Sequence, residues 1–176
     1  MAKETIVEHP FDPIYSSTSR ILILGSLPSV KSREQAFYYG HPRNRFWKVL
    51  STIFQEELPK SIEEKKNFLL AHDIALWDVV AKCKIQGSSD ATIKEVEVTN
   101  LDRILSQAPI QTIFCNGGVA LRYYHKFQEP KTHIQAQLLP STSPANASYS
   151  LEDLIEIWKD KILESEKKEA RGKDTL

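Results

Sequence analysis

Apolar residues along the chain form four short runs, separated by longer stretches with a helical period. The runs predict strands at Arg20–Gly25, Ile74–Val80, Thr112–Asn116 and Ile134–Pro140. The first and third runs are almost continuously apolar, which is typical of strands covered on both faces of a parallel sheet. The pattern therefore predicts a central parallel sheet of about four strands.

Helices are predicted between these strands and after the last one. Apolar residues between positions 46 and 54 recur at i, i+3, i+4, i+7 and i+8, which places them on one stripe of a helix. Ser61 and Glu64 have the spacing of a capping box. Strands that alternate with helices predict an α/β domain. Further helices are predicted at Leu101–Ala108, after Gly118 and at Leu151–Ile162.

A single domain is expected to occupy residues 1–165. The chain has 176 residues, which is an ordinary size for one domain with a sizeable core. Residues 166–176 are rich in charge and predict a tail that frays from the end of the last helix.

Charge and composition argue against several classes of protein. With 23 basic and 23 acidic residues, the chain is formally neutral and does not fit a protein that coats nucleic acid by bulk charge. The N-terminus lacks an apolar leader and no run is long enough to span a membrane, which predicts a cytoplasmic protein, nucleoid-associated in a prokaryote. The two cysteines, Cys83 and Cys115, are too few for a four-cysteine metal site and are expected to be small fillers.

Small or polar residues follow the end of every predicted strand. Because ligands bind outside the carboxyl ends of strands in open α/β sheets, we expect a site where these ends meet. For Asp78 a structural role, accepting backbone N–H bonds, is slightly favoured over a functional one. Asn116 could cap a helix or bind the edge of a base. The strand ends are Gly25–Ser26, Asp78, Asn116–Gly118 and Ser141–Ser143.

An aromatic and basic segment, "AFYYGHPRNRFW" at positions 36–47, follows the first strand. The wider segment 31–48 holds five basic residues and one acid. Rings interleaved with arginines suit phosphate contacts and base stacking, which contributes roughly 1–3 kcal/mol per base. The alternative is that Phe37 and Trp47 pack under the loop while the arginines are solvated. Asn44 is equally well placed for a helix cap and for a functional role.

Two other segments are candidates for phosphate-binding loops. "GSLPSVKS" at positions 25–32 lacks the spacing of a P-loop, whereas the hydroxyl-rich "STSPANAS" at 141–148 could donate hydrogen bonds to phosphates or form an ordinary turn. No histidine has the spacing of a metal ligand. We therefore expect neither a metal nor a cofactor.

Four segments together resemble the uracil-DNA glycosylase superfamily, and within it most closely the hypoxanthine-DNA (deoxyinosine) glycosylase branch. The resemblance spans Phe11 to Trp158 and implies a three-layer α/β/α fold around a four-stranded parallel sheet. It also implies a monofunctional enzyme that flips a damaged nucleotide into a pocket and hydrolyses its N-glycosidic bond without metal or cofactor. The four segments are "ILILGSLPSVKS", "FYYGHPRNRFWKVL", "IALWDVV" and "LLPSTSPAN".

Two departures from the superfamily pattern bear on the substrate. Leu27 stands where uracil-specific relatives carry an Asp or Asn that positions the attacking water. The last loop begins Ser141-Thr142 and lacks the His that stabilises a departing uracil in other relatives. Both changes favour a purine leaving group. The resemblance to the hypoxanthine branch implies Asn44 as the catalytic residue.

The resemblance and the residue types together assign the other site residues. Double- or single-stranded DNA that contains a deaminated base is the expected partner, bound by a monomer. The expected base-binding residues are Gly25, Ser26, Phe37, Tyr39, Asp78 and Asn116. The expected DNA-binding residues are Ser29, Ser32, Arg43, Arg45, Ser141, Ser143, Pro144 and Asn146.

Three alternative functions stay open at this point. The chain could act on uracil, or on uracil and thymine in mismatches. It could be a non-catalytic module that binds damaged or single-stranded DNA, an interpretation supported by Leu27. It could also be a small-molecule enzyme such as a nucleoside hydrolase, although Arg43 and Arg45 favour a polymeric phosphate backbone.

Overall fold

A four-stranded parallel sheet forms the centre of the molecule. The computed structural model describes residues 4–9, 12–27, 37–86 and 90–174. The strand order is β3-β2-β6-β7. This architecture confirms the predicted α/β fold class. The strands are β2 (Ile21–Gly25), β3 (Ile74–Asp78), β6 (Thr112–Asn116) and β7 (Ala136–Leu139).

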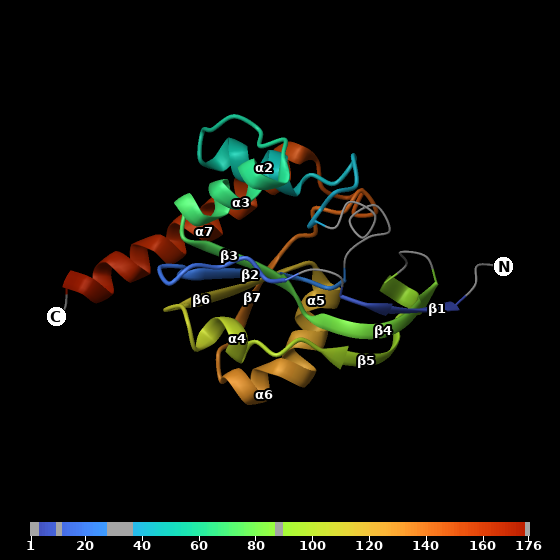
Figure 1. The fold of residues 1–176 in the computed structure, drawn as a ribbon. Coiled ribbons are helices and arrows are strands. Elements are labelled where there is room, and N and C mark those ends of the chain that lie inside the picture. The colour runs from blue at the N-terminus through green and yellow to red at the C-terminus, as the bar shows by residue number, and fades with distance from the viewer. Residues whose placement is uncertain (1–3, 10–11, 28–36, 87–89, 175–176) are drawn as a thin grey trace.

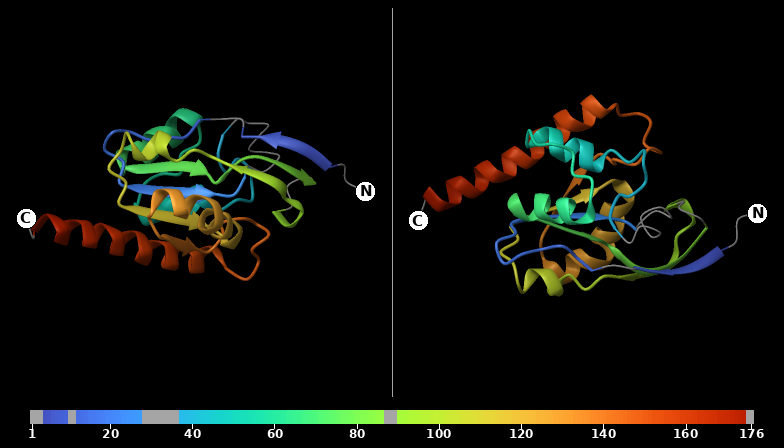
Figure 2. Two further views of the ribbon diagram at one scale, coloured as in Figure 1. Left: turned by 90° about the horizontal axis from the view of Figure 1, so that it is seen from below. Right: turned by 45° about the horizontal axis from the view of Figure 1, so that its top comes forward.

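Helices cover both faces of this sheet, as Figures 1 and 2 show. A π-helical turn at Tyr124–Gln128 joins α5 to α6. Because both faces are covered, every residue of β2 and β3 is buried. One face carries α2 (Phe46–Ile53), α3 (Ile62–Ala71) and α7 (Leu151–Asp174). The other carries α4 (Asp102–Leu105), α5 (Gly118–Tyr123) and α6 (Glu129–Thr132).

The predicted helix signals act as the sequence suggested. The apolar stripe of α2 is buried, and Phe46 meets Trp158 of α7 edge to face at 5.9 Å. Ser61 and Glu64 form the predicted capping box at the start of α3. The helix α7 is longer than expected: the segment after residue 165, predicted to fray, is helical to Asp174.

A second, antiparallel sheet was not predicted. It consists of β1 (Glu4–Glu8), β4 (Val80–Gln86) and β5 (Lys94–Val98), in the order β1-β4-β5. The predicted strand Ile74–Val80 is in fact divided, since β3 ends at Asp78 and β4 begins at Val80. β1 buries only Val7, and β4 buries Val80, Cys83 and Ile85 between lysines, so these strands lack the continuous apolar run that marked the central strands. Figure 1 shows this sheet extending from the carboxyl end of β3.

Each sheet has its own hydrophobic core. The larger core lies between the central sheet and its helices, and Cys115 is one of its members. The smaller one contains Val7, Val80, Cys83, Ile85 and Ile93. Both cysteines are buried, which fits the role of small fillers. Within the described ranges, no helix is both long and apolar enough to cross a membrane.

Buried hydrogen bonds fix the junction between the two sheets. Thr99, just after β5, donates from Oγ1 to the carbonyl of Asp78 at 2.8 Å. The π-helical turn places Gln128 in the interior, where its Nε2 donates to the carbonyl and the hydroxyl of Thr99 at 2.9 and 3.0 Å. Thr99 therefore links the end of β3 to the helices on one face.

This junction gives a first prediction. Thr99→Val keeps the shape of the side chain but leaves the Asp78 carbonyl without its donor, so the free energy of unfolding should fall by about 1–3 kcal/mol. The control is Thr52→Val, because the exposed Thr52 hydroxyl also donates to a carbonyl, that of Lys48. Chemical denaturation of both variants is the measurement. Equal losses of stability in the two would contradict the role given to Thr99.

Candidate functional site

Three strand ends meet at the carboxyl edge of the central sheet. Gly25 of β2 pairs with Asp78 of β3, and Asn116 ends β6 on the other side of β2. The predicted convergence of polar residues at this edge is therefore present. Asp78 and Asn116 are both buried, so their polar atoms need partners inside the protein.

Gly25 lies under a crowded group of polar atoms. A Cβ at this position would lie 2.4 Å from Asp78 Oδ1 and 2.8 Å from Tyr39 Oη, closer than real Cβ atoms approach other atoms. The N–H of Val79 donates to the carbonyl of Gly25 at 2.8 Å, and that of Val80 to Ser26 at 3.0 Å. Glycine at position 25 thus lets the aromatic segment close over the end of β2.

Thr142 connects the last strand end to the rest of the site. Its backbone N–H donates to Asn116 Oδ1 at 3.1 Å, and its hydroxyl accepts from Asn116 Nδ2 at 3.0 Å. Its carbonyl accepts from the backbone N–H of Arg45 at 3.1 Å. Thr142 is completely buried. It therefore joins the end of β6, the loop after β7 and the start of α2.

Arg45 holds the last loop through its guanidinium. Nη2 donates to the carbonyls of Ser143 and Asn146 at 2.8 and 3.0 Å, and Nη1 donates to that of Tyr149. Nε contacts the carbonyl of Thr142 at 3.4 Å. Since its donors are directed at main-chain oxygens, Arg45 shapes the loop that was predicted to bind DNA. The phosphate contact predicted for Arg45 itself stays a prediction.

Asn44 lies one residue before the N-cap of α2, which is Arg45, and its side chain bonds to the first N–H of the helix. Its Oδ1 accepts from the N–H of Phe46 at 3.0 Å, and its own N–H donates to the carbonyl of His41 at 2.9 Å. The predicted N-cap position is therefore off by one residue, although the Asn44 side chain does satisfy the first N–H of α2. Asn44 is partly exposed, and an amide has a second lone pair on oxygen and two N–H groups on nitrogen. A cap of this kind leaves the side chain able to bind a water molecule.

The two aromatic residues predicted to contact the base lie in different places. Phe37 is only 4% exposed and its ring stacks on Trp47 at 6.2 Å, with Lys66 over it at 6.0 Å. The packing alternative given for Phe37 is therefore present in the structure, and its contact with a base stays a prediction. Tyr39 instead stacks on Phe46 at 4.0 Å and places its hydroxyl over Gly25.

Asp78 has a partner that the sequence did not reveal. His9, just after β1, lies with Nε2 2.7 Å from Asp78 Oδ2, and both side chains are about 95% buried. His9 also meets the Trp77 ring edge to face at 6.4 Å. The structural role predicted for Asp78 named backbone N–H groups as its donors, whereas the partner that the structure gives its carboxylate is the His9 side chain.

The remaining predicted residues divide into three groups. Ser29 and Ser32 lie outside the described residues. Arg43 and Pro144 are exposed. Ser141, Ser143 and Asn146 bond within their own loop: Ser141 Oγ accepts from the N–H of Ser143, and Asn146 Nδ2 donates to the carbonyl of Ser141. These three residues line a cavity of about 570 Å³ that also borders Gly117 and Gly118.

Two site residues, His9 and Thr142, were missed in the sequence. His9 lies in a segment without apolar periodicity, and no spacing links it to Asp78. Thr142 stood within the quoted "STSPANAS", but a hydroxyl in a polar loop gives no sign that it is buried. Its position two residues after the last strand was the one signal available.

Leu27 lies in an apolar environment. Its partly buried side chain packs against the smaller core. A residue in this environment cannot orient a water molecule, which agrees with the interpretation of this departure in the sequence.

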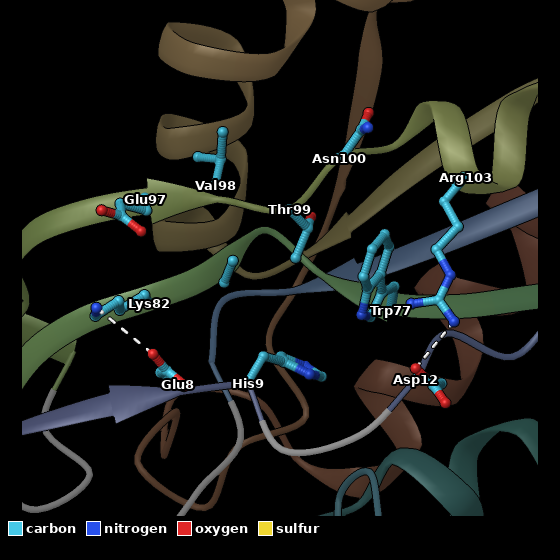
Figure 3. Close-up of a pocket in the computed structure, with 11 residues that line it drawn as sticks. Glu8, His9, Asp12, Trp77, Lys82, Glu97, Val98, Thr99, Asn100 and Arg103 are labelled. Carbon is cyan, nitrogen blue, oxygen red and sulfur yellow. Dashed lines mark hydrogen bonds and ion pairs between the residues drawn. The ribbon is translucent and has the colours of Figure 1, made fainter.

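A second cavity of about 450 Å³ lies between β3 and the small sheet. Figure 3 shows His9, Trp77 and Arg103 along it, with Arg103 paired to Asp12. Its lining carries both signs of charge, from Glu8, Asp12 and Glu97 and from Lys82 and Arg103.

Among the described residues, no group of three or more His, Cys, Asp or Glu could hold a metal ion.

Comparison with known proteins agrees with this geometry. The family model described as "Uracil DNA glycosylase superfamily" matches residues 13–164. A hypoxanthine DNA glycosylase of Methanosarcina acetivorans is 32% identical over 82% of this chain and 92% of the relative. A second, of Methanosarcina barkeri, is 36% identical over 77% of this chain and 86% of the relative.

A solved structure is similar as well. It is the solution NMR structure of a protein from Methanosarcina acetivorans described as a candidate uracil DNA glycosylase. The TM-score is 0.75 at 30% identity, and the match covers 89% of this chain and 96% of the other.

The hydrogen bonds from the Arg45 guanidinium to the last loop act as a clamp and give a second prediction. Arg45→Met should lower the free energy of unfolding by about 1–2 kcal/mol, because two partly buried carbonyls lose a charged donor. Hydrogen exchange at the amides of residues 143–149 should become faster. Arg43→Met is the control, because the exposed Arg43 side chain should change stability by less than about 0.5 kcal/mol. Unaltered exchange in the Arg45 variant would contradict the clamp.

Proposed function

The chain belongs to the uracil-DNA glycosylase superfamily, and from this premise we propose that it removes hypoxanthine from DNA by hydrolysing the N-glycosidic bond. One observation carries the proposal, which is that Asn44 and Asn116 are connected at the carboxyl edge of the central sheet. Asn116 bonds to Thr142, and Thr142 bonds to the backbone of Arg45, the residue after Asn44. Leu27, in contrast, packs against the smaller core. The site is thus built from amides and hydroxyls, without the acid or amide that the Leu27 position would carry in uracil-specific relatives.

Asn44 is the proposed catalytic residue. Glycosidic cleavage passes through an oxocarbenium-like state, so charge stabilisation matters more than a strong base. In this proposal the Asn44 amide holds a water molecule beside the sugar. The water oxygen bonds to C1′, the C1′–N9 bond breaks, and the base leaves with the electron pair and takes up a proton. The proton lost by the water passes to solvent.

The leaving base needs hydrogen-bond donors. Asn116 and Ser143 are the proposed side chains, together with backbone N–H groups. Thr142 accepts one Asn116 N–H, so the second N–H of that amide is the one that Tyr39 and a bound base would share. The pairing also fixes the amide orientation, which makes such a contact more effective because no reorganisation is needed.

We propose that the DNA is bound by the aromatic and basic segment at positions 36–47 and by the loop after β7. Arg43 is exposed and is proposed to contact a phosphate, whereas Arg45 acts indirectly by shaping the loop from Ser141 to Tyr149. The protein is proposed to act as a monomer on double- or single-stranded DNA that contains a deaminated base. An inosine pair is easier to open than a well-matched pair, which assists selection.

The relatives named as hypoxanthine DNA glycosylases support this substrate over uracil. A uracil or mismatch activity would lack the water-positioning residue at Leu27 and the histidine at the start of the last loop. Oligonucleotides that contain hypoxanthine, uracil, xanthine or a thymine mismatch, followed by alkali to break abasic sites, compare these substrates directly. A DNA-binding module without activity would bind them and leave all of them intact.

Excision of hypoxanthine should persist in the presence of a chelator, because no cluster of metal ligands occurs among the described residues. The product should be an intact abasic site. The measurement is strand cleavage by alkali after incubation with excess EDTA. Loss of activity that a divalent ion restores would contradict the mechanism. Borohydride trapping of a covalent adduct would contradict a monofunctional enzyme.

Asn44→Ser separates the catalytic role from the capping role. Serine is also a good cap residue, so stability should change by less than about 1 kcal/mol. Serine is too short to hold the water, and single-turnover excision should fall roughly 100-fold or more while DNA binding persists.

Asn100→Ser is a matched control for this variant. Asn100 Oδ1 caps α4 in the same way, accepting from the N–H of Asp102 at 3.1 Å. It should show the same small change in stability and a wild-type rate. Wild-type excision by the Asn44 variant, with an unchanged melting temperature, would reduce Asn44 to a cap.

A further inference from the structure

The hydroxyl of Tyr39 is buried and has no hydrogen-bond partner of ordinary geometry among the described residues. It lies over Gly25, beside Asp78 Oδ1. Burial and the charge of Asp78 raise the pKa of Tyr39, whereas an interaction of the phenol oxygen with the Asn116 side chain lowers it, as an amide N–H donor does, and leaves the phenol O–H without an acceptor. Buried hydroxyls without partners destabilise a protein, and such groups are rare. Tyr39 therefore has a free donor at the edge of the sheet where we propose that the base binds.

The backbone of Tyr39 is strained as well. Its φ is +55°, a left-handed conformation that is unfavourable for a residue with a bulky side chain. The ring is held by stacking on Phe46, which is completely buried at the start of α2. Stacking on Phe46 thus maintains the unfavourable backbone conformation of Tyr39. In this conformation the Tyr39 hydroxyl is directed at the end of β2.

Asp78 and His9 form the support of this hydroxyl. Burial, and then the negative charge of Asp78, raise the pKa of Tyr39, so the phenol stays protonated and can donate at neutral pH. His9 Nε2 is 2.7 Å from Asp78 Oδ2 and holds the carboxylate in place. A hydrogen bond from His9 also draws negative charge away from the side that faces the site.

We propose that Tyr39 Oη donates a hydrogen bond to an acceptor atom of the departing purine, and that His9 is a positioning residue that acts through Asp78. The inference rests on the proposed function, since it takes the base to bind at this edge. Negative charge grows on the base as the C1′–N9 bond breaks, so a donor there stabilises the transition state more than the bound substrate. Hypoxanthine has a carbonyl oxygen where adenine has an amino group, and a donor matches only the former.

Tyr39→Phe tests the hydroxyl. The variant keeps the ring on Phe46 and removes only the oxygen. Single-turnover excision of hypoxanthine should fall roughly 10- to 100-fold with DNA affinity unchanged. The melting temperature should rise, because an unpaired polar atom is no longer buried. A structural hydroxyl predicts the opposite change in melting temperature. Excision at the wild-type rate, or a fall in melting temperature, would overturn the assignment.

Tyr38→Phe is the matched control. The neighbouring Tyr38 is also buried, but its Oη donates to the carbonyl of Asp12 at 2.9 Å. This variant should therefore melt at a lower temperature and excise hypoxanthine within about twofold of the wild-type rate. The pair of variants contrasts one satisfied and one unsatisfied hydroxyl in the same segment.

His9→Leu tests the positioning role in a double-mutant cycle. Alone, it should slow excision, measured well below the melting temperature of each variant. Combined with Tyr39→Phe, it should cause at most about a twofold further loss, because the group through which it acts is already removed. Equal fold-losses in both backgrounds would show that His9 does not act through Tyr39.

The outcomes separate this inference from the proposed function. Intact hypoxanthine oligonucleotides after treatment with wild-type protein would reject the function, and the rate comparison would then use whichever base the wild type removes. If the wild type removes no base, a melting temperature of Tyr39→Phe no higher than wild type overturns the inference, and a higher one supports an unpaired hydroxyl. Hypoxanthine excision by the wild type with an equal rate in Tyr39→Phe would reject the inference alone.

Discussion

The site depends on the buried pairing between Asn116 and Thr142. Two hydrogen bonds join the end of β6 to the loop after β7, and the Thr142 carbonyl then fixes the backbone of Arg45. Because Asn44 and Phe46 flank Arg45, the same pairing sets where α2 begins and where the ring of Tyr39 can stack. Both Asn116–Thr142 bonds lie in the interior, where an unpaired amide would be strongly unfavourable. Thr142 thus couples three segments that are far apart in the sequence, through its N–H, its hydroxyl and its carbonyl.

Most of the central sheet could be predicted from the sequence because its strands are apolar on both faces. The strands β2 and β6 coincide with the predicted runs to within a residue. Helix signals were equally reliable where they depend on local contacts, as in the capping box of Ser61 and Glu64. The convergence of Gly25, Asp78 and Asn116 followed from parallel topology alone. These successes share one feature, which is that the information lies within a few residues of each element.

Other parts of the structure depend on contacts between distant residues. The small sheet was missed because its strands alternate lysine and glutamate with apolar residues, a pattern that charged loops also show. His9 and Asp78 are separated by most of the first half of the chain, and no spacing announces their contact. Phe37 and Tyr39 have similar surroundings in sequence, yet one ring packs in the core and the other lies over Gly25. Arg45 resembled a phosphate ligand, whereas its donors are directed at the protein's own carbonyls.

The two separate cores have a consequence for how the molecule responds to heat. The small sheet has few buried apolar residues, so it should open at a lower free energy than the central sheet. Opening would carry His9 away from Asp78, while the Asn116–Thr142 pairing and α2 remain folded. Mild warming is therefore expected to inactivate the protein reversibly before it denatures. The temperature range in which the protein is expected to be active is therefore limited by the stability of the small sheet and not by that of the central sheet.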